Sequence, residues 1–193
     1  MPPTVKPISD AGQAAAIDTV VLAFAADPVA RWTWSGSYEY LTGMPKLVRA
    51  FGGQAFTHGT AICTDTNAGV ALWLPPGVHP DEEKLGEALE STVAPAHCQD
   101  VFATFEQMAK YHPDEPHWYL PMIGVDPAHQ GKGHGDALMS HVLAQCDRDG
   151  TPAYLESTNP RNISLYLRHG FVALGTVQAG SSPPLTPMLR RPR

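Results

Sequence analysis

"IGVDPAHQGKGHGDALM", residues 123–139, joins a short apolar segment to a helical pattern through a turn and a run of glycines. Gly131, Gly133 and Gly135 occupy alternate positions in this stretch. Glycine allows a main chain to approach another group closely, and a helix N-terminus carries unpaired N–H groups and about half a positive charge. The stretch therefore predicts a strand, a loop and a helix. The loop either binds the phosphates of a nucleotide or cofactor or forms a tight turn without a ligand.

Two known phosphate-binding motifs do not fit this loop. A Walker loop needs four residues between its glycines and a Ser or Thr after its lysine, whereas here six residues separate the glycines at 124 and 131 and a glycine follows Lys132. The dinucleotide motif G-x-G-x-x-G needs a third glycine where this chain has Asp136. The pattern that remains is Q-x-x-G-x-G over residues 130–135.

The overall composition indicates a single domain. With 193 residues, 43% of them hydrophobic, the chain is long enough for one well-filled core and short for two full domains, so we expect one domain over residues 1–193. A formal net charge of −6 argues against nucleic acid or an anionic membrane as the partner, because either favours a basic surface. The C-terminal "LRRPR" is a short basic exception, which we interpret as a solvated tail.

The cysteines and the apolar segments bear on the compartment. Cys63, Cys98 and Cys146 are scattered and form no CxxC spacing, which favours a reducing compartment and no disulfide framework. No apolar run approaches the roughly 20 residues that a membrane-spanning helix needs. The N-terminal "MPPTVKPISD" lacks the layout of a signal peptide. We therefore expect a soluble, cytoplasmic protein.

Hydrophobic periodicity predicts an order of strands and helices along the chain. Strands are expected over residues 4–9, 60–65, 69–77, 117–125, 152–158 and 171–177, with a last one over 186–191 at the sheet edge. Helices are expected over residues 14–24, 38–56, from Pro80 onward, 100–111, after the glycine loop, and 159–170. On the helix after the loop, Leu138, Val142 and Cys146 form an inward stripe. This order predicts an α/β domain built on a mixed sheet.

The glycine stretch, followed by "YLESTNPRNISLYLRHGF" at residues 154–171, resembles the GNAT superfamily of acyl-CoA-dependent N-acetyltransferases. It is most similar to the branch of puromycin N-acetyltransferase-like enzymes. The resemblance is specific over residues 118–172, because two motifs occur in the right order and at the right spacing, and it is architectural elsewhere. It implies a mixed, largely antiparallel sheet of about six to seven strands with a splayed parallel pair, flanked by helices.

The resemblance also implies acetyl-CoA as the cosubstrate and assigns residues to it. Main-chain groups of Ile123, Gly124 and Val125 would bond the pantetheine arm. The pyrophosphate loop would be formed, mainly through N–H donors, by Gln130, Gly131, Lys132, Gly133, His134 and Gly135. Asn159, which is also a helix N-cap candidate, and Asn162 would contact the pantetheine. A carboxylate beside a diphosphate is unfavourable, so the Asp136 side chain is expected to point outward.

Seven residues after Asn159, Tyr166 matches the family tyrosine that faces the thioester sulfur, and its implied role is to protonate the departing thiolate. The implied reaction is direct attack by an amine. An alkylamine with a pKa near ~10.4 must first lose a proton, which costs roughly 4 kcal/mol at neutral pH. Glu156 is favoured as the base over His117, although Glu156 also suits binding the ammonium or a neighbouring backbone. The nine histidines show no metal-ligand spacing, so no metal is expected.

The aromatic segment "RWTWSGSYEY", residues 31–40, lies where this fold borders the acceptor pocket. Trp32, Trp34 and Tyr38 either line that pocket or pack in the core. The helices between residues 80 and 111 either cover the pocket or form a homodimer surface. The first hypothesis is a small-molecule amine as acceptor. The alternatives are an acetyltransferase acting on a peptide or protein amine, and a non-catalytic CoA-binding sensor.

Overall fold

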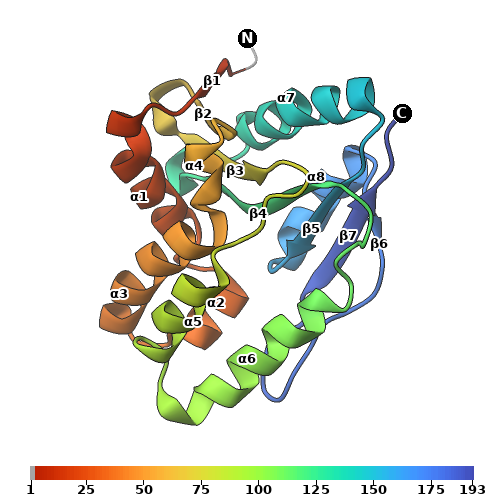
Figure 1. The fold of residues 1–193 in the computed structure, drawn as a ribbon. Helices are drawn as coiled ribbons and strands as arrows, with labels where there is room; N and C mark the ends of the chain where they lie inside the picture. The colour runs from red at the N-terminus through yellow and green to blue at the C-terminus, as the bar shows by residue number, and fades with distance from the viewer. Residues whose placement is uncertain (1–2) are drawn as a thin grey trace.

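The computed structural model describes residues 3–193, apart from the side chain of Thr66, and shows a seven-stranded sheet with helices on both faces (Figure 1). In sheet order the strands run β1-β2-β3-β4-β5-β7-β6. Their bounds are β1 Val5–Pro7, β2 Ala61–Thr64, β3 Gly69–Leu74, β4 Trp118–Val125, β5 Ala153–Ser157, β6 Val172–Ala173 and β7 Thr186–Arg190. All neighbouring pairs are antiparallel except β4 and β5, which are parallel. The predicted mixed, largely antiparallel α/β fold is confirmed.

The helices divide between the two faces of the sheet. They are α1 Gln13–Ala23, α2 Pro28–Thr33, α3 Ser37–Leu47, α4 Gln54–Thr57, α5 Glu82–Glu90, α6 Pro95–Ala109, α7 His134–Asp149 and α8 Ile163–Arg168. Alternate residues of β3 enter two different clusters, since successive side chains of a strand point to opposite faces. Val70, Leu72 and Leu74 pack with helices α1 to α6, whereas Ala71 and Trp73 pack with α7 and α8. Both faces of β3 are therefore buried.

The parallel strands β4 and β5 diverge soon after they meet. They pair only at Trp118↔Ala153 and Tyr119↔Tyr154. A register shift lies in the same part of β4, because Leu74 pairs with Tyr119 and Leu72 with Met122, so two residues of β4 face one of β3. One of those two is Pro121, which has no N–H to offer a neighbouring strand. The bulge turns β4 away from β5 and leaves a wedge between them, as the predicted splayed pair requires.

Several element predictions need correction. The segment 38–56 is not one helix: α3 ends at Leu47, a π-helical turn follows over Val48–Gly52, and α4 begins at Gln54. Gly52 lies against Leu72 so closely that a Cβ would come within 2.7 Å of the leucine side chain, which accounts for the irregular turn. Helix α2 was not anticipated. Pro80 does not begin a helix, because α5 starts at Glu82 with Asp81 as its N-cap.

The C-terminal end also differs from expectation. Strand β7 is not at the sheet edge but lies between β5 and β6. Its last residue, Arg190, is only 4% exposed and bonds both carboxylate oxygens of Asp147 at 2.8 Å, so "LRRPR" is not simply a solvated tail. Among the helices of residues 3–193, none is both long enough and apolar enough to span a bilayer.

Candidate active site

The edge of β4 that faces the wedge carries main-chain groups without a strand partner. The N–H of Asp126 donates to the carbonyl of Ala68 at 2.8 Å. In an antiparallel pair, the N–H and C=O groups of every second residue point to the partner strand, and those of the residues in between point away from it. The same alternation directs the main-chain groups of Gly124 to β3 and those of Ile123 and Val125 toward the wedge. Close packing against α1 accounts for the glycine at position 124, because a Cβ there would lie 2.7 Å from the Cβ of Ala23.

The glycine loop leads directly into α7. Gly131 has a φ of 74° and Gly133 a φ of 85°, values that side chains disfavour. The first helical bond of α7 runs from Ala137 N–H to Gly133 O at 3.0 Å, so the N–H groups of residues 131–136 precede the helical ladder. At Gly135, a Cβ would come within 3.2 Å of Leu165 in α8. The loop therefore presents backbone donors at the positive end of a sixteen-residue helix.

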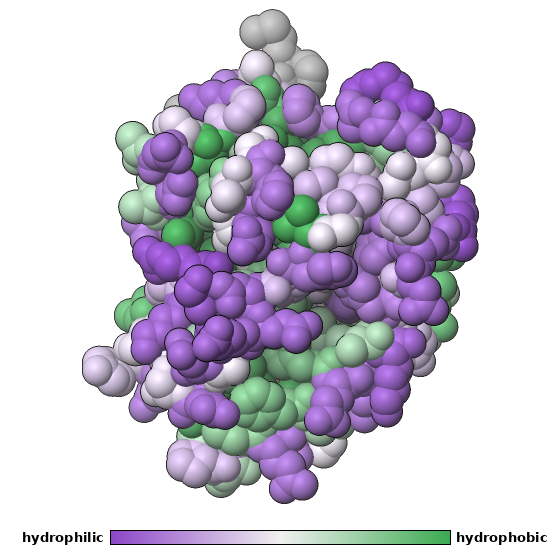
Figure 2. Space-filling view, in the orientation of Figure 1, coloured by the Kyte–Doolittle hydropathy of each residue, from purple (hydrophilic) through white to green (hydrophobic). Residues whose placement is uncertain are grey.

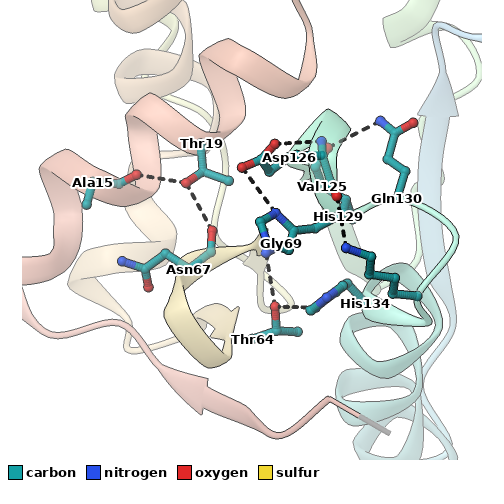
Figure 3. Close-up of polar contacts among 12 residues, drawn as sticks. Ala15, Thr19, Thr64, Asn67, Gly69, Val125, Asp126, His129, Gln130 and His134 are labelled. Carbon is teal, nitrogen blue, oxygen red and sulfur yellow. Dashed lines mark hydrogen bonds and ion pairs between the residues drawn. The ribbon is translucent and has the colours of Figure 1, made fainter.

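The polar side chains of the loop are engaged by the protein itself (Figure 3). Lys132 Nζ donates to the carbonyl of Ala128 at 3.0 Å, and Gln130 Nε2 donates to that of Val125 at 3.3 Å. His134 Nδ1 lies 2.8 Å from the Thr64 hydroxyl, and desolvation lowers the pKa of this histidine. The groups that the glycine loop leaves available for a ligand are therefore main-chain N–H groups more than charged side chains.

Asp136 in the first turn of α7 is directed to α8, as expected for a carboxylate beside an anion site. Its Oδ1 lies 3.3 Å from Arg168 Nη2 and 3.2 Å from His169 Nε2. The Arg168 guanidinium offsets its negative charge near the N-terminus of the helix, whereas burial lowers the pKa of His169.

The second motif forms the start of α8. Asn159 Oδ1 accepts a hydrogen bond from Arg161 N–H at 3.1 Å, so the predicted capping role is present, on the 3-10 turn Pro160–Asn162. Tyr166 is 4% exposed and lies edge-on to Phe171, with ring centroids 6.2 Å apart. Burial, followed by the charge of Asp27, raises the pKa of Tyr166. Its hydroxyl is therefore protonated at neutral pH.

A cavity of about 80 Å³ lies next to the wedge, between the helical layer, the middle of β4 and the end of β5. Figure 2 shows apolar surface on this side of the molecule, bordered by hydrophilic side chains. The polar lining is Asp27, Thr33, Thr104, Glu156 and Thr158. The aromatic lining is Phe24, Trp32, Trp34, Phe51 and Phe105, and the remainder is aliphatic.

Glu156 on β5 brings a carboxyl group to this cavity. Tyr119 Oη donates to Glu156 Oε2 at 2.8 Å. Burial outweighs this bond and raises the pKa of Glu156 to about 7. The group therefore exchanges a proton close to neutral pH, as a general base must.

His117 does not line the cavity. Its Nδ1 lies 2.7 Å from the carbonyl of Glu115, which can only accept, so Nδ1 carries the proton. Its Nε2 lies 3.0 Å from His112 Nε2. Burial, then the charges of His117 and His79, lowers the pKa of His112 to about 4. The two histidines form a buried pair beside the rings of Tyr119 and Tyr154, and Glu156 alone of the two predicted bases reaches the cavity.

The aromatic segment divides between pocket and surface. Trp34 lines the cavity and is 1% exposed, with Nε1 donating to Thr92 Oγ1 at 3.1 Å. Trp32 also lines it, and its Nε1 donates to Ser181 Oγ at 3.1 Å. Tyr38, by contrast, is 79% exposed and lies outside the cavity. It sits on the outer face of α3, so its predicted place in the pocket is not supported.

Asp27 is a cavity residue that sequence analysis missed. It is 5% exposed and caps α2: Oδ1 accepts from the N–H groups of Val29 and Ala30, each at 3.0 Å. Its Oδ2 accepts from the Thr158 hydroxyl at 2.6 Å. Burial raises its pKa against these bonds. The sequence pattern that could have indicated this residue is Asp27-Pro28, because an Asp N-cap followed by proline at the first helical position marks the start of a helix.

Within residues 3–193, no three His, Cys, Asp or Glu side chains gather in a way that could hold a metal ion.

Comparison with known proteins adds independent findings. The model of the acetyltransferase (GNAT) family matches residues 78–171. An uncharacterized N-acetyltransferase, C550.08 of Schizosaccharomyces pombe (strain 972 / ATCC 24843), is 35% identical over 82 residues, which are 41% of this chain and 33% of that protein. The chain thus spans about a third of the length of this curated relative.

Solved structures match over the whole chain. A Corynebacterium glutamicum ATCC 13032 structure described as histone acetyltransferase HPA2 and related acetyltransferase is 29% identical, with a TM-score of 0.71 and coverage of 100% of this chain and 98% of that one. Arylalkylamine N-acetyltransferase 2 of Aedes aegypti also gives a TM-score of 0.71, covering 98% and 99%, but at 18% identity it shows a shared fold only. The similarity to the puromycin N-acetyltransferase branch stays a prediction, because none of these matches bears on it.

Proposed function

We propose that this chain, whose residues 78–171 match the acetyltransferase (GNAT) family model, moves an acetyl group from acetyl-CoA to a primary amine of a small molecule, by direct attack within a ternary complex. One observation carries this proposal beyond the family: an apolar cavity beside the β4–β5 wedge contains a glutamate whose pKa is about 7. A partly ionised carboxyl group at that place suits removal of a proton from an ammonium.

The wedge and the glycine loop fit the shape and charge of CoA. The N–H groups of residues 131–136 face no helical partner, and glycine at 131 and 133 keeps the approach to them open. Lys132 and His134 would contribute their main chains, since their side chains are held by Ala128 and Thr64. Ile123 and Val125 would bond the pantetheine from the free edge of β4, and Asn159 and Asn162, which follow β5 in the chain, would also contact it.

The chain's own residues would then divide the proton transfers. Acetyl-CoA supplies the acetyl thioester. Glu156 would take the proton that an amine must lose before attack, a step that costs roughly 4 kcal/mol for an alkylamine at pH 7. Tyr166, buried and protonated, would give a proton to the departing thiolate. We assign no proton transfer from the amine to His117, because it lies outside the cavity.

The test measures amine-dependent release of free thiol from acetyl-CoA. Wild type should release thiol with at least one small primary amine, and Glu156→Gln should lower kcat at pH 7.5 about 100-fold while the Kd for CoA stays the same. The matched control is Glu83→Gln, a change on the exposed side of α5. Cofactor binding without amine-dependent release by wild type would instead favour the CoA-binding sensor.

A protein amine is the second candidate acceptor, because the 29% identical Corynebacterium structure carries a histone acetyltransferase description. The small volume of this mainly apolar cavity, about 80 Å³, favours a small molecule over an extended peptide. Comparing kcat/KM for a lysine-containing histone-tail peptide with that for small amines decides between the two. A higher value for the peptide would reverse our assignment.

A further inference from the structure

Asp27 is a buried carboxyl group of the cavity for which the proposed reaction has no role. It is 5% exposed and accepts three hydrogen bonds, two at Oδ1 from Val29 and Ala30 and one at Oδ2 from Thr158. Burial raises the pKa of this carboxyl group, and these donors oppose that rise because they favour the ionised form. A carboxylate has about four acceptor sites, so one site on Oδ2 remains for a group in the cavity.

The position of Asp27 relates it directly to the proposed base. The Asp27–Thr158 bond joins the turn between α1 and α2 to the residue that follows β5, across 131 positions of the chain. Thr158 comes two residues after Glu156, and all three side chains line the same cavity. A ligand inside the cavity therefore meets two carboxyl groups and is otherwise surrounded mainly by apolar side chains.

The two carboxyl groups are not equivalent. Asp27 accepts hydrogen bonds from two main-chain N–H groups and the Thr158 hydroxyl, whereas the groups that bond Glu156 include the phenol of Tyr119. Two titratable groups in different environments commonly take different roles in one site. Asp27, with its three donors, suits binding a cation, and Glu156 suits reversible protonation.

We propose that Asp27 binds the ammonium group of the acceptor and that the acceptor is a hydrophobic primary monoamine. This inference rests on the proposed acetyltransferase function. The ammonium would lie against Oδ2 of Asp27, and the apolar body would lie against the aromatic lining that includes Trp32, Phe51 and Phe105.

The lining also excludes a second charge. Apart from the two carboxyl groups, its polar members are the neutral threonines 33, 104 and 158. A second cationic group on the acceptor would be desolvated among aromatic and aliphatic side chains without a partner, which is unfavourable. Phenylalkylamines and branched alkylamines therefore fit the cavity, whereas diamines and guanidinium amines do not.

The experiment compares 2-phenylethylamine, the neutral 2-phenylethanol and the dication agmatine. Asn is as good an N-cap as Asp, so Asp27→Asn removes the charge and keeps the cap of α2. We expect this variant to raise the KM for 2-phenylethylamine about tenfold or more, with kcat lowered less than about threefold, the Kd for CoA unchanged and the inhibition constant of 2-phenylethanol unchanged. Wild type should prefer 2-phenylethylamine over agmatine by kcat/KM.

The matched control is Asp81→Asn, which removes the charge of the carboxylate that caps α5 outside the cavity. This variant should leave the KM for 2-phenylethylamine and the KM for agmatine as in wild type. If Asp27→Asn does not fold, Asp27→Ser, which also caps, replaces it. An unchanged KM, an equal rise for the neutral alcohol, or a preference for agmatine would overturn the inference.

The failure of this inference and the failure of the proposed function are separable. Calorimetry of 2-phenylethylamine binding tests Asp27 even if wild type releases no thiol: tenfold weaker binding to Asp27→Asn supports the ammonium site, and equal binding refutes it. Wild-type thiol release with an unchanged Asp27→Asn variant would keep the acetyltransferase and reject Asp27 as its binding residue.

Discussion

At the scale of single residues, the protonation of Glu156 should set how the rate depends on pH. Burial places the pKa of this carboxyl at about 7, and a base acts only in its ionised form. The sign follows directly: kcat/KM should rise between pH 6 and 8 as Glu156 loses its proton, because kcat/KM reports pKa values of the free enzyme.

The measurement is kcat/KM against pH for wild type and for Glu156→Gln. We expect the rise near pH 7 to disappear in the variant, because Gln has no proton to lose there. An identical profile in both proteins would show that another group titrates, and the control Glu83→Gln should retain the wild-type profile.

Single residues also show where sequence patterns fail. Asp27 was passed over because an Asp-Pro pair after a helix reads as a turn, and its contact with Thr158 spans 131 positions. Tyr38 was expected either in the pocket or in the core because aromatic residues cluster around it, but it is 79% exposed, and Trp32 and Trp34 line the cavity instead. Which side of a helix faces a cavity depends on what packs against that helix.

At the scale of elements, the loop before α7 tests whether backbone geometry holds the cofactor. Gly133 has a φ of 85°, and a side chain in this region costs roughly 1–2 kcal/mol. Gly133→Ala should therefore shift the loop and its N–H groups, and we expect calorimetry to show CoA binding weakened about tenfold.

The control for this change is Gly86→Ala in α5. No atom lies within 4 Å of a Cβ at Gly86, and its φ is outside the positive range, so alanine should be accepted there without effect on CoA affinity. Equal affinity of Gly133→Ala and wild type would mean that the loop does not carry the pyrophosphate.

Elements with a strong local pattern were predicted well. The inward stripe Leu138, Val142 and Cys146 is buried on α7, and the apolar strands β2, β3, β4 and β5 occur close to their expected positions. The segment 38–56 was less predictable, because Gly52 approaches Leu72 of the sheet and the helix changes to a π-helical turn there. That irregularity reflects a contact with a distant strand, which periodicity does not record.

At the scale of the whole molecule, Arg190 connects three elements at the C-terminal end. Its guanidinium bonds Asp147 of α7 at 2.8 Å twice, and its Nε donates to the carbonyl of His169, just after α8, at 2.8 Å. The side chain of Arg190 is 4% exposed and that of Asp147 is 31% exposed. Truncation would leave a partly buried carboxylate and a carbonyl without their partners.

Arg190→Ala should lower the free energy of unfolding by about 2–3 kcal/mol. This is a small loss for removing one partner of a buried ion pair, because the Asp147 side chain is partly solvated. Urea unfolding measures this directly. Arg191→Ala is the matched control, since the Arg191 side chain is 62% exposed and its pair with Glu115 should contribute less than about 1 kcal/mol. Equal stabilities of the two variants would contradict the structural role of Arg190.

The homodimer and the cytoplasmic location expected from the sequence stay predictions. Leu22, Tyr38 and Leu41 are exposed apolar side chains on α1 and α3.

The sequence by itself determined the features that depend on neighbours along the chain. These are the apolar strands, the amphipathic α7, the glycine loop and the Asn159–Tyr166 spacing that led to the GNAT family. Each reflects local sterics, hydrogen bonding or periodicity, which a short segment carries alone. Only the tertiary structure decided the place of β7 between β5 and β6, the cavity, the raised pKa of Glu156 and the site around Asp27. Those properties arise from desolvation and from contacts between segments far apart in the chain, so they exist only once the sheet and its helices have packed together.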